Sequence, residues 1–64
     1  MALTDWELWA VAHEAIRQHG RDAGPHARSR IEALRGAGNK AGVQAWTAIA
    51  RRIDELVDSG KARH

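Results

Sequence analysis

The 64-residue chain contains no cysteine, which excludes a disulfide framework and any zinc site built from thiolates. It also contains no phenylalanine or tyrosine, so its three tryptophans must supply most of the large apolar volume. No apolar run approaches the roughly 20 residues that a membrane span requires. Asp5 and Glu7 stand where a secretory signal peptide would carry positive charge. From these observations we expect a soluble, cytoplasmic protein with no membrane-spanning segment.

The formal net charge is +2, but the charges are unevenly distributed. Residues 1–19 are acidic overall, whereas residues 20–52 carry seven Arg and Lys side chains against two carboxylates. A basic segment of this kind is typical of proteins that bind nucleic acid or an acidic partner.

The apolar residues recur with the helical period of 3.6, and no stretch alternates with the period of 2 that is typical of a strand. We therefore predict an all-α protein that folds as a small three-helix bundle. The helices are expected at about 4–19, 25–35 and 40–58, with Gly60 ending the last one. The chain is short enough to form a single helical domain, 1–64, with a frayed C-terminal tail from about residue 60.

Local signals mark the ends of these helices. Thr4 and Glu7 are predicted to form a capping box, in which each side chain binds the backbone amide of the other residue. Gly20 is expected to end the first helix, and Pro25 suits the first turn of the second. Asn39 is a favourable N-cap residue for the third helix.

Each predicted helix carries a stripe of apolar residues, and together the stripes predict one core. Trp9 and Trp46 are expected to contribute to it, whereas Trp6 and His13 lie at its edge. The remaining residues predicted to face the core are Leu8, Ala12, Ala15, Ile16, Ala27, Ile31, Leu34, Ile49, Ile53 and Leu56.

Gly42 lies inside the predicted third helix, where a glycine costs about 1 kcal/mol relative to alanine. It lies on the apolar face, one turn before Trp46. We interpret it as a point of close approach by a bulky neighbour, with Trp6 or Trp9 the expected one. The alternative is that a glycine is simply tolerated near the start of the helix.

Two stretches of the sequence, DWELWA at 5–10 and AGVQAWTAIA at 41–50, carry a family resemblance. They resemble the DWELWA and AGxxAWxxIA motifs of a family of short uncharacterised proteins from alphaproteobacteria. The resemblance covers nearly the whole chain. It implies a small bacterial helical protein, and it implies no catalytic residues.

The side chains that could carry chemistry are not grouped in the sequence. His13 and His19 do not share a helix face well, His26 and His64 lie elsewhere, and there is no HExxH motif. The glycines do not form a phosphate-binding loop, because the P-loop spacing and its lysine are missing. We therefore expect no catalytic, cofactor-binding or metal-binding residues, no cofactor and no enzyme activity.

The function that the sequence favours is that of a small protein–protein interaction module. A short chain without disulfides or metal is marginally stable alone, and pairing is a common remedy. The apolar stripes of the first and third helices are wider than the second helix can cover, which favours a homodimer or another protein partner. Trp6 and Val57, each at the edge of its stripe, are the expected partner-binding residues. The other interpretation of the wide stripes is a monomer with scattered apolar surface.

The alternative function is weak nucleic-acid binding through the basic middle segment and the exposed face of the last helix. Lys40, Gln44, Thr47 and Arg51 recur there at i, i+4, i+7 and i+11, and such side chains contact base edges and phosphates. Acidic residues follow on the same helix, and exposed basic residues more often serve only to solvate a surface. This alternative is therefore ranked second.

Overall fold

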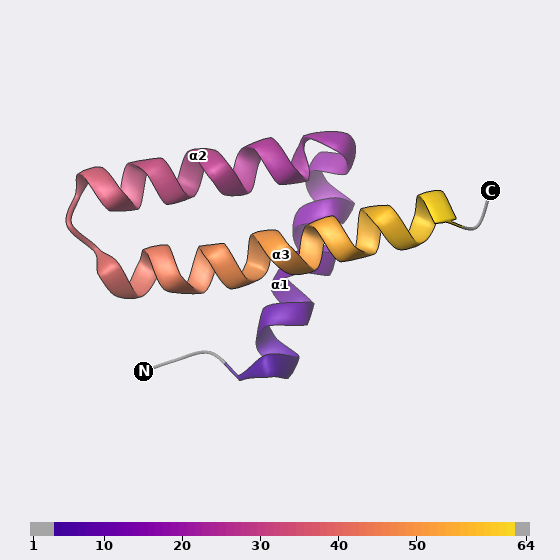
Figure 1. Cartoon of the computed structure of the whole chain (residues 1–64), viewed down its shortest axis with the longest axis horizontal. Helices are drawn as coiled ribbons and strands as arrows, with labels where there is room; N and C mark the ends of the chain where they lie inside the picture. Colours follow the sequence, from indigo (N-terminus) through magenta and orange to yellow (C-terminus); the bar gives the residue numbers. More distant parts are fainter. Residues whose placement is uncertain (1–3, 63–64) are drawn as a thin grey trace.

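The computed structural model describes residues 4–62 of the chain, with side chains from Thr4 to Asp58. Helix α1 runs Asp5–His19, the 3-10 helix η1 runs Gly20–Asp22, α2 runs Ala23–Gly36 and α3 runs Lys40–Ala62 (Figure 1). Residues 4–62 contain no strand, and the predicted all-α class is therefore confirmed. None of the helices in this range combines the length and the apolarity needed to cross a membrane.

The first two α-helices are joined without any loop. Because α1, η1 and α2 follow one another directly, residues 5–36 form one bent helical segment, and α3 is the second helical segment. Gly20 lies at the bend with a φ of +55°, a backbone conformation that glycine adopts far more readily than other residues. Its N–H still donates to the carbonyl of Ile16, so the last turn of α1 is satisfied up to the bend.

Helix α2 begins two residues before Pro25, rather than at the predicted start. Proline is tolerated in this first turn because the amides there have no intrahelical acceptor. Ala23, which the earlier start brings into the helix, is 1% exposed. Its burial stabilises the extra turn, so tertiary packing rather than the proline sets this boundary.

Helix α3 continues to Ala62 and includes Gly60, so the predicted end at about 58 is wrong. Glycine lowers the stability of a helix but ends it only where the backbone turns into the left-handed region. Of the expected frayed tail, residues 63–64 lie outside the described residues.

The core is formed where the bent segment packs on α3. Helix α2 lies antiparallel beside α3, and α1 crosses α3 (Figure 1). Between Thr4 and Asp58 the buried side chains are two from each α-helix: Ala12, Ala15, Ala23, Ala27, Ile49 and Ile53. Larger apolar side chains surround them and are only partly buried: Leu8, Val11, Ile16, Trp46, Ala50 and Leu56. Because four of the six buried residues are alanine, the helices approach closely around a core of small volume.

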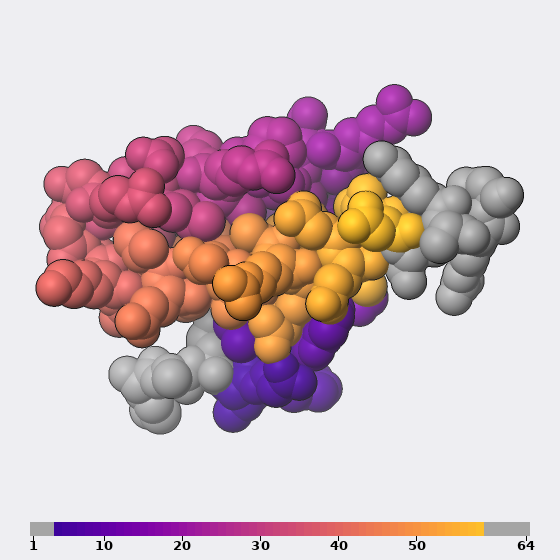
Figure 2. Space-filling model, in the orientation of Figure 1, coloured from indigo at the N-terminus to yellow at the C-terminus, as the bar shows by residue number. Residues whose placement is uncertain are grey.

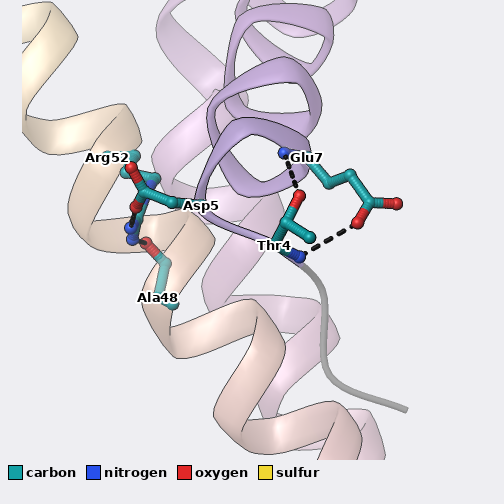
Figure 3. Close-up of polar contacts among 5 residues, drawn as sticks. All are labelled: Thr4, Asp5, Glu7, Ala48 and Arg52. Atoms are coloured by element: carbon teal, nitrogen blue, oxygen red, sulfur yellow. Dashed lines mark hydrogen bonds and ion pairs between the residues drawn. The ribbon is translucent and has the colours of Figure 1, made fainter.

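Both predicted N-caps are confirmed. The Thr4 hydroxyl accepts from the Glu7 amide at 3.2 Å, and the Glu7 carboxylate accepts from the Thr4 amide at 2.9 Å (Figure 3). Before α3, the Asn39 side-chain oxygen accepts from the Gly42 amide at 2.9 Å.

The predicted close approach at Gly42 is also confirmed, but its neighbour is different. A Cβ atom on Gly42 would stand 3.0 Å from the Leu34 Cδ2 atom and 3.1 Å from the Asn39 side chain. Leu34 lies there because α2 and α3 are joined by a short turn, which packs the end of α2 against the start of α3. The expectation that Trp6 or Trp9 would fill this role is wrong.

Candidate interaction surface

Arg52 of α3 fixes the first turn of α1. Its guanidinium forms an ion pair with Asp5 and also donates to the Ala48 carbonyl at 3.0 Å (Figure 3). The same guanidinium carbon lies 5.3 Å from the centroid of the Trp9 ring, which is within the range of a cation–π interaction. The acidic start of α1 is therefore held against the side of α3.

Trp6 does not share this packing. Trp6 is 77% exposed, a larger exposed fraction than that of any other large apolar residue in the described part of the chain. Successive side chains of a helix point about 100° apart, so the turn that directs Asp5 toward α3 directs Trp6 elsewhere. An almost fully exposed indole is costly to hydrate, and tryptophan is enriched among the residues that dominate protein interfaces.

Val57 is the other exposed large apolar side chain, at 39%. It lies in the C-terminal part of α3, whereas Trp6 lies in the first turn of α1, and these segments are well separated in Figure 1. The structure therefore leaves both predicted partner-binding residues accessible but does not bring them into one patch.

The four residues of the nucleic-acid alternative line two adjoining hollows on α3. One hollow, of about 300 Å³, is lined by Val43, Gln44, Thr47, Ala48, Arg51 and Arg52. The other, of about 360 Å³, is lined by Arg35, Gly38, Asn39, Lys40, Val43 and Gln44. Because both include Val43 and Gln44, they form one shallow track along the N-terminal half of the helix. We call Lys40, Val43, Gln44, Thr47 and Arg51 the α3 strip.

The α3 strip is open to solvent. Apart from half-buried Val43, its side chains are exposed, and α3 forms the front of the molecule between α2 and α1 in Figure 2. The Thr47 hydroxyl donates to the Val43 carbonyl at 2.7 Å, which leaves its oxygen free to accept. Lys40 and Arg51 form no ion pair with any side chain from Thr4 to Asp58, so both cations are available to a partner.

The first turn of α1 has the opposite charge. Asp5 and Glu7 are one residue on either side of Trp6. The Thr4 backbone N–H, and then the Thr4 hydroxyl contact, lower the pKa of Glu7 below its usual value. Glu7 is therefore ionised at neutral pH, and the exposed indole lies between two carboxylate-bearing residues.

A ring cluster that sequence reasoning missed lies at the junction of α1 and α2. The imidazoles of His19 and His26 are stacked with centroids 4.2 Å apart, and the His26 ring meets the Trp46 ring edge-on at 5.9 Å. The guanidinium carbon of Arg30 also lies over the Trp46 ring, 5.9 Å from its centroid. The seven-residue spacing of the histidines, two helical turns, was a usable signal only if the helix continued through η1.

This cluster does not resemble a metal centre. Among the described residues, no group of three or more His, Asp or Glu side chains is placed to hold a metal ion. The cluster instead packs the bend of residues 5–36 against α3, through Trp46.

The model of a protein family of unknown function matches residues 4–61, which is most of the chain. The chain belongs to this family, DUF6961. The predicted membership of an uncharacterised family is therefore confirmed. Comparisons with curated proteins and with solved structures found no match.

The DUF6961 match includes every feature of the candidate surface. It begins at the N-cap of α1, spans the bend, and ends inside α3, so Trp6 and the α3 strip both lie within it. Because the function of the family is unknown, the match assigns no role to these residues.

Proposed function

We propose that this DUF6961 protein is a small, non-enzymatic helical module that acts by binding another protein, with a second copy of the chain as the first partner to test. The observation that carries the proposal is Trp6, which is 77% exposed, whereas only six of the residues from Thr4 to Asp58 are buried. Burial of one tryptophan removes roughly 150–250 Å² of surface from water, a large gain for so small a domain.

The arrangement of the helices supports the same proposal. The proposal includes the packing of α1, α2 and α3 as a three-helix bundle, whose core is completed only when a partner covers the outer side of α1. The half-buried ring of larger apolar side chains around the alanine-rich core is consistent with a bundle that is marginally stable alone. A cytoplasmic location belongs to the proposal, and a chain without cysteine is compatible with that reducing compartment.

Site-specific crosslinking in the source cell tests this function. A photoreactive residue at Ala10, one turn after Trp6, should crosslink to a discrete protein, which includes the chain itself. The same residue at Ala33, which is also exposed but lies on α2, is the matched control and should give no such product. Trp6→Ala should remove the product at position 10. Equal products at both positions, or a product that persists without Trp6, would overturn the proposal.

A second candidate, nucleic-acid binding, is supported by the α3 strip. Lys40 and Arg51 extend from it without an ion pair to any side chain between Thr4 and Asp58, and Gln44 and Thr47 lie between them. Against this candidate, two neighbouring arginines are already occupied, since Arg52 pairs with Asp5 and Arg35 pairs with Glu32. These two arginines are therefore less available to phosphate than Lys40 and Arg51 are.

Fluorescence anisotropy with duplex DNA and RNA separates the two candidates. Because phosphate binding releases counterions, its affinity falls steeply with salt. We expect no complex tighter than about 100 μM at physiological salt, the weak end of non-specific affinity. A tighter, salt-sensitive complex that Lys40→Ala and Arg51→Ala both weaken would favour the nucleic-acid function instead.

A further inference from the structure

We propose that the chain forms a reciprocal dimer, in which the first turn of α1 in each copy docks on the α3 strip of the other. The proposal rests on the proposed function and names the surface and the partner. The docking element is Trp6 with Asp5 and Glu7, and the receiving element is the hollow around Val43 and Thr47 with Lys40 and Arg51 at its ends.

The two elements are complementary in charge and in character. Because helix side chains advance by 100° per residue, Asp5 and Glu7 flank Trp6 on opposite sides. Lys40 and Arg51 are separated by about 16 Å along α3, with an alkyl and a hydroxyl side chain between them. The acidic first turn that carries the indole therefore meets a basic hollow, in which Val43 and Thr47 lie between Lys40 and Arg51.

The structure already contains one contact of this chemistry. Within a single chain, Arg52 pairs with Asp5 and lies over the face of Trp9. In the dimer, Arg51 of one copy repeats this arrangement with the Trp6 ring and the acidic first turn of the other copy. The planar guanidinium of arginine suits this double contact, because its N–H groups pair with a carboxylate while its face stacks on an indole.

A chain cannot make this contact with itself. The ion pair of Asp5 holds the first turn of α1 at Arg52, and Trp6 remains exposed. The two elements nevertheless adjoin, because Arg52 and Ala48 line the hollow and flank the anchored turn (Figure 3). In a two-fold dimer the same surface of both copies forms the interface, so each copy docks its α1 turn on the partner and binds the partner's α1 turn on its own α3 strip.

Sedimentation equilibrium tests the dimer and its surface together. We expect the full chain to associate between about 10 and about 500 μM, because the population of a homodimer depends on concentration. Trp6→Ala should weaken the dimer about tenfold or more, as the loss of an interface hot spot does. Arg51→Glu should also weaken it, and added salt should do the same to the wild type. Arg21→Glu, an equal change of charge on exposed η1, is the control and should have little effect.

A charge exchange makes the test specific. Glu7→Lys alone should weaken association, as Arg51→Glu does. An equimolar mixture of these two variants should regain a dimer of near wild-type strength, because both contacts of that heterodimer join opposite charges. Circular dichroism of each variant checks that it remains helical.

Two failures are distinguishable. A dimer that is insensitive to Trp6→Ala and Arg51→Glu, or a mixture that regains nothing, overturns this surface while self-association stands. A wild-type chain that stays monomeric at the highest concentration overturns the dimer itself. The crosslink from position 10 to a different protein would then preserve the proposed function without this inference.

Discussion

The Leu34 side chain of α2 lies directly against Gly42 of α3, so close that a Cβ atom on Gly42 would stand 3.0 Å from Leu34 Cδ2. The Asn39 side chain, which caps α3, approaches the same point to 3.1 Å. A glycine at this position lets the two helices begin their antiparallel packing immediately after the turn. The cost in helix propensity is offset by that close contact.

Gly42→Leu is therefore expected to destabilise the protein by about 1–3 kcal/mol, as overpacking of a filled site does, although leucine is the better helix former. Thermal unfolding followed by circular dichroism measures the effect. Leu34→Ala in the same background should recover part of the loss, because it removes the atom that clashes. A higher melting temperature for Gly42→Leu would show that the contact is not a constraint.

The tryptophans should differ sharply in their contributions to stability. Trp46 is half-buried against the core and contacts His26 and Arg30, so Trp46→Ala is expected to cost about 2–4 kcal/mol, somewhat less than for a fully buried tryptophan. Trp6→Ala is the matched control and should change stability by less than about 0.5 kcal/mol at a protein concentration too low for association. Urea unfolding of both variants measures the difference, and equal losses would contradict the packing of α3.

Removal of Arg52 should cost more than removal of its partner. Asp5→Ala breaks one ion pair whose carboxylate is largely exposed, and such pairs contribute about 0–1 kcal/mol. Arg52→Ala also removes the stacking on Trp9 and the bond to the Ala48 carbonyl, so a loss of about 1–2 kcal/mol is expected. A double-mutant cycle isolates the ion pair. A larger loss for Asp5→Ala would mean that the cap of α1, and not Arg52, dominates.

Glu14 should make folding sensitive to acid. The Arg17 side chain, at 2.5 and 2.9 Å, and then Gln18, at 2.9 Å, lower the pKa of Glu14 from 4.5 to about 2. A carboxyl whose pKa is lower in the folded state contributes stability above its unfolded value and loses it as the pH falls toward the folded value. This contribution should therefore be complete above about pH 4.5 and disappear toward pH 2.

Two measurements check this titration. Carbon-detected NMR of Glu14 should give a midpoint near 2, and Glu14→Gln should flatten the dependence of stability on pH between 4.5 and 2. A midpoint at the ordinary glutamate value would show that the Arg17 contact does not persist in solution.

Local chemistry made the ends of α1 and the start of α3 predictable. Thr4, Glu7 and Asn39 act within four residues of their partners, so the capping pattern is visible without any knowledge of the fold. The class of the fold was predictable for the same reason, because the period of the apolar residues is a local property. The exposure of Trp6 and Val57 also agreed with their positions at the edges of the apolar stripes.

The remaining features depend on how helices pack, which the sequence does not state. Helix α2 begins at Ala23 rather than at Pro25, because the burial of Ala23 in the core outweighs the local signal from the proline. The neighbour of Gly42 could not be chosen without knowing that α2 and α3 are antiparallel. The His19–His26 stack was missed because it requires a helix that continues through the GRD stretch. For the candidate surface, residue types were predictable from the pattern, but not the anchoring of α1 by Arg52.

Because α1, η1 and α2 follow one another directly, the number of residues in η1 fixes the rotation of α2 about its axis relative to α1. Where a loop joins helices, an added residue is absorbed by the loop, but here the joint consists only of the three residues of η1. One inserted or deleted residue between His19 and Ala23 would turn α2 about its axis by roughly 100° relative to α1. Ala23 and Ala27 would then rotate away from α3, and the place of Ala27 would be taken by Arg28 after a deletion or by His26 after an insertion. The length of the GRD joint is thus as strictly constrained as the composition of the core.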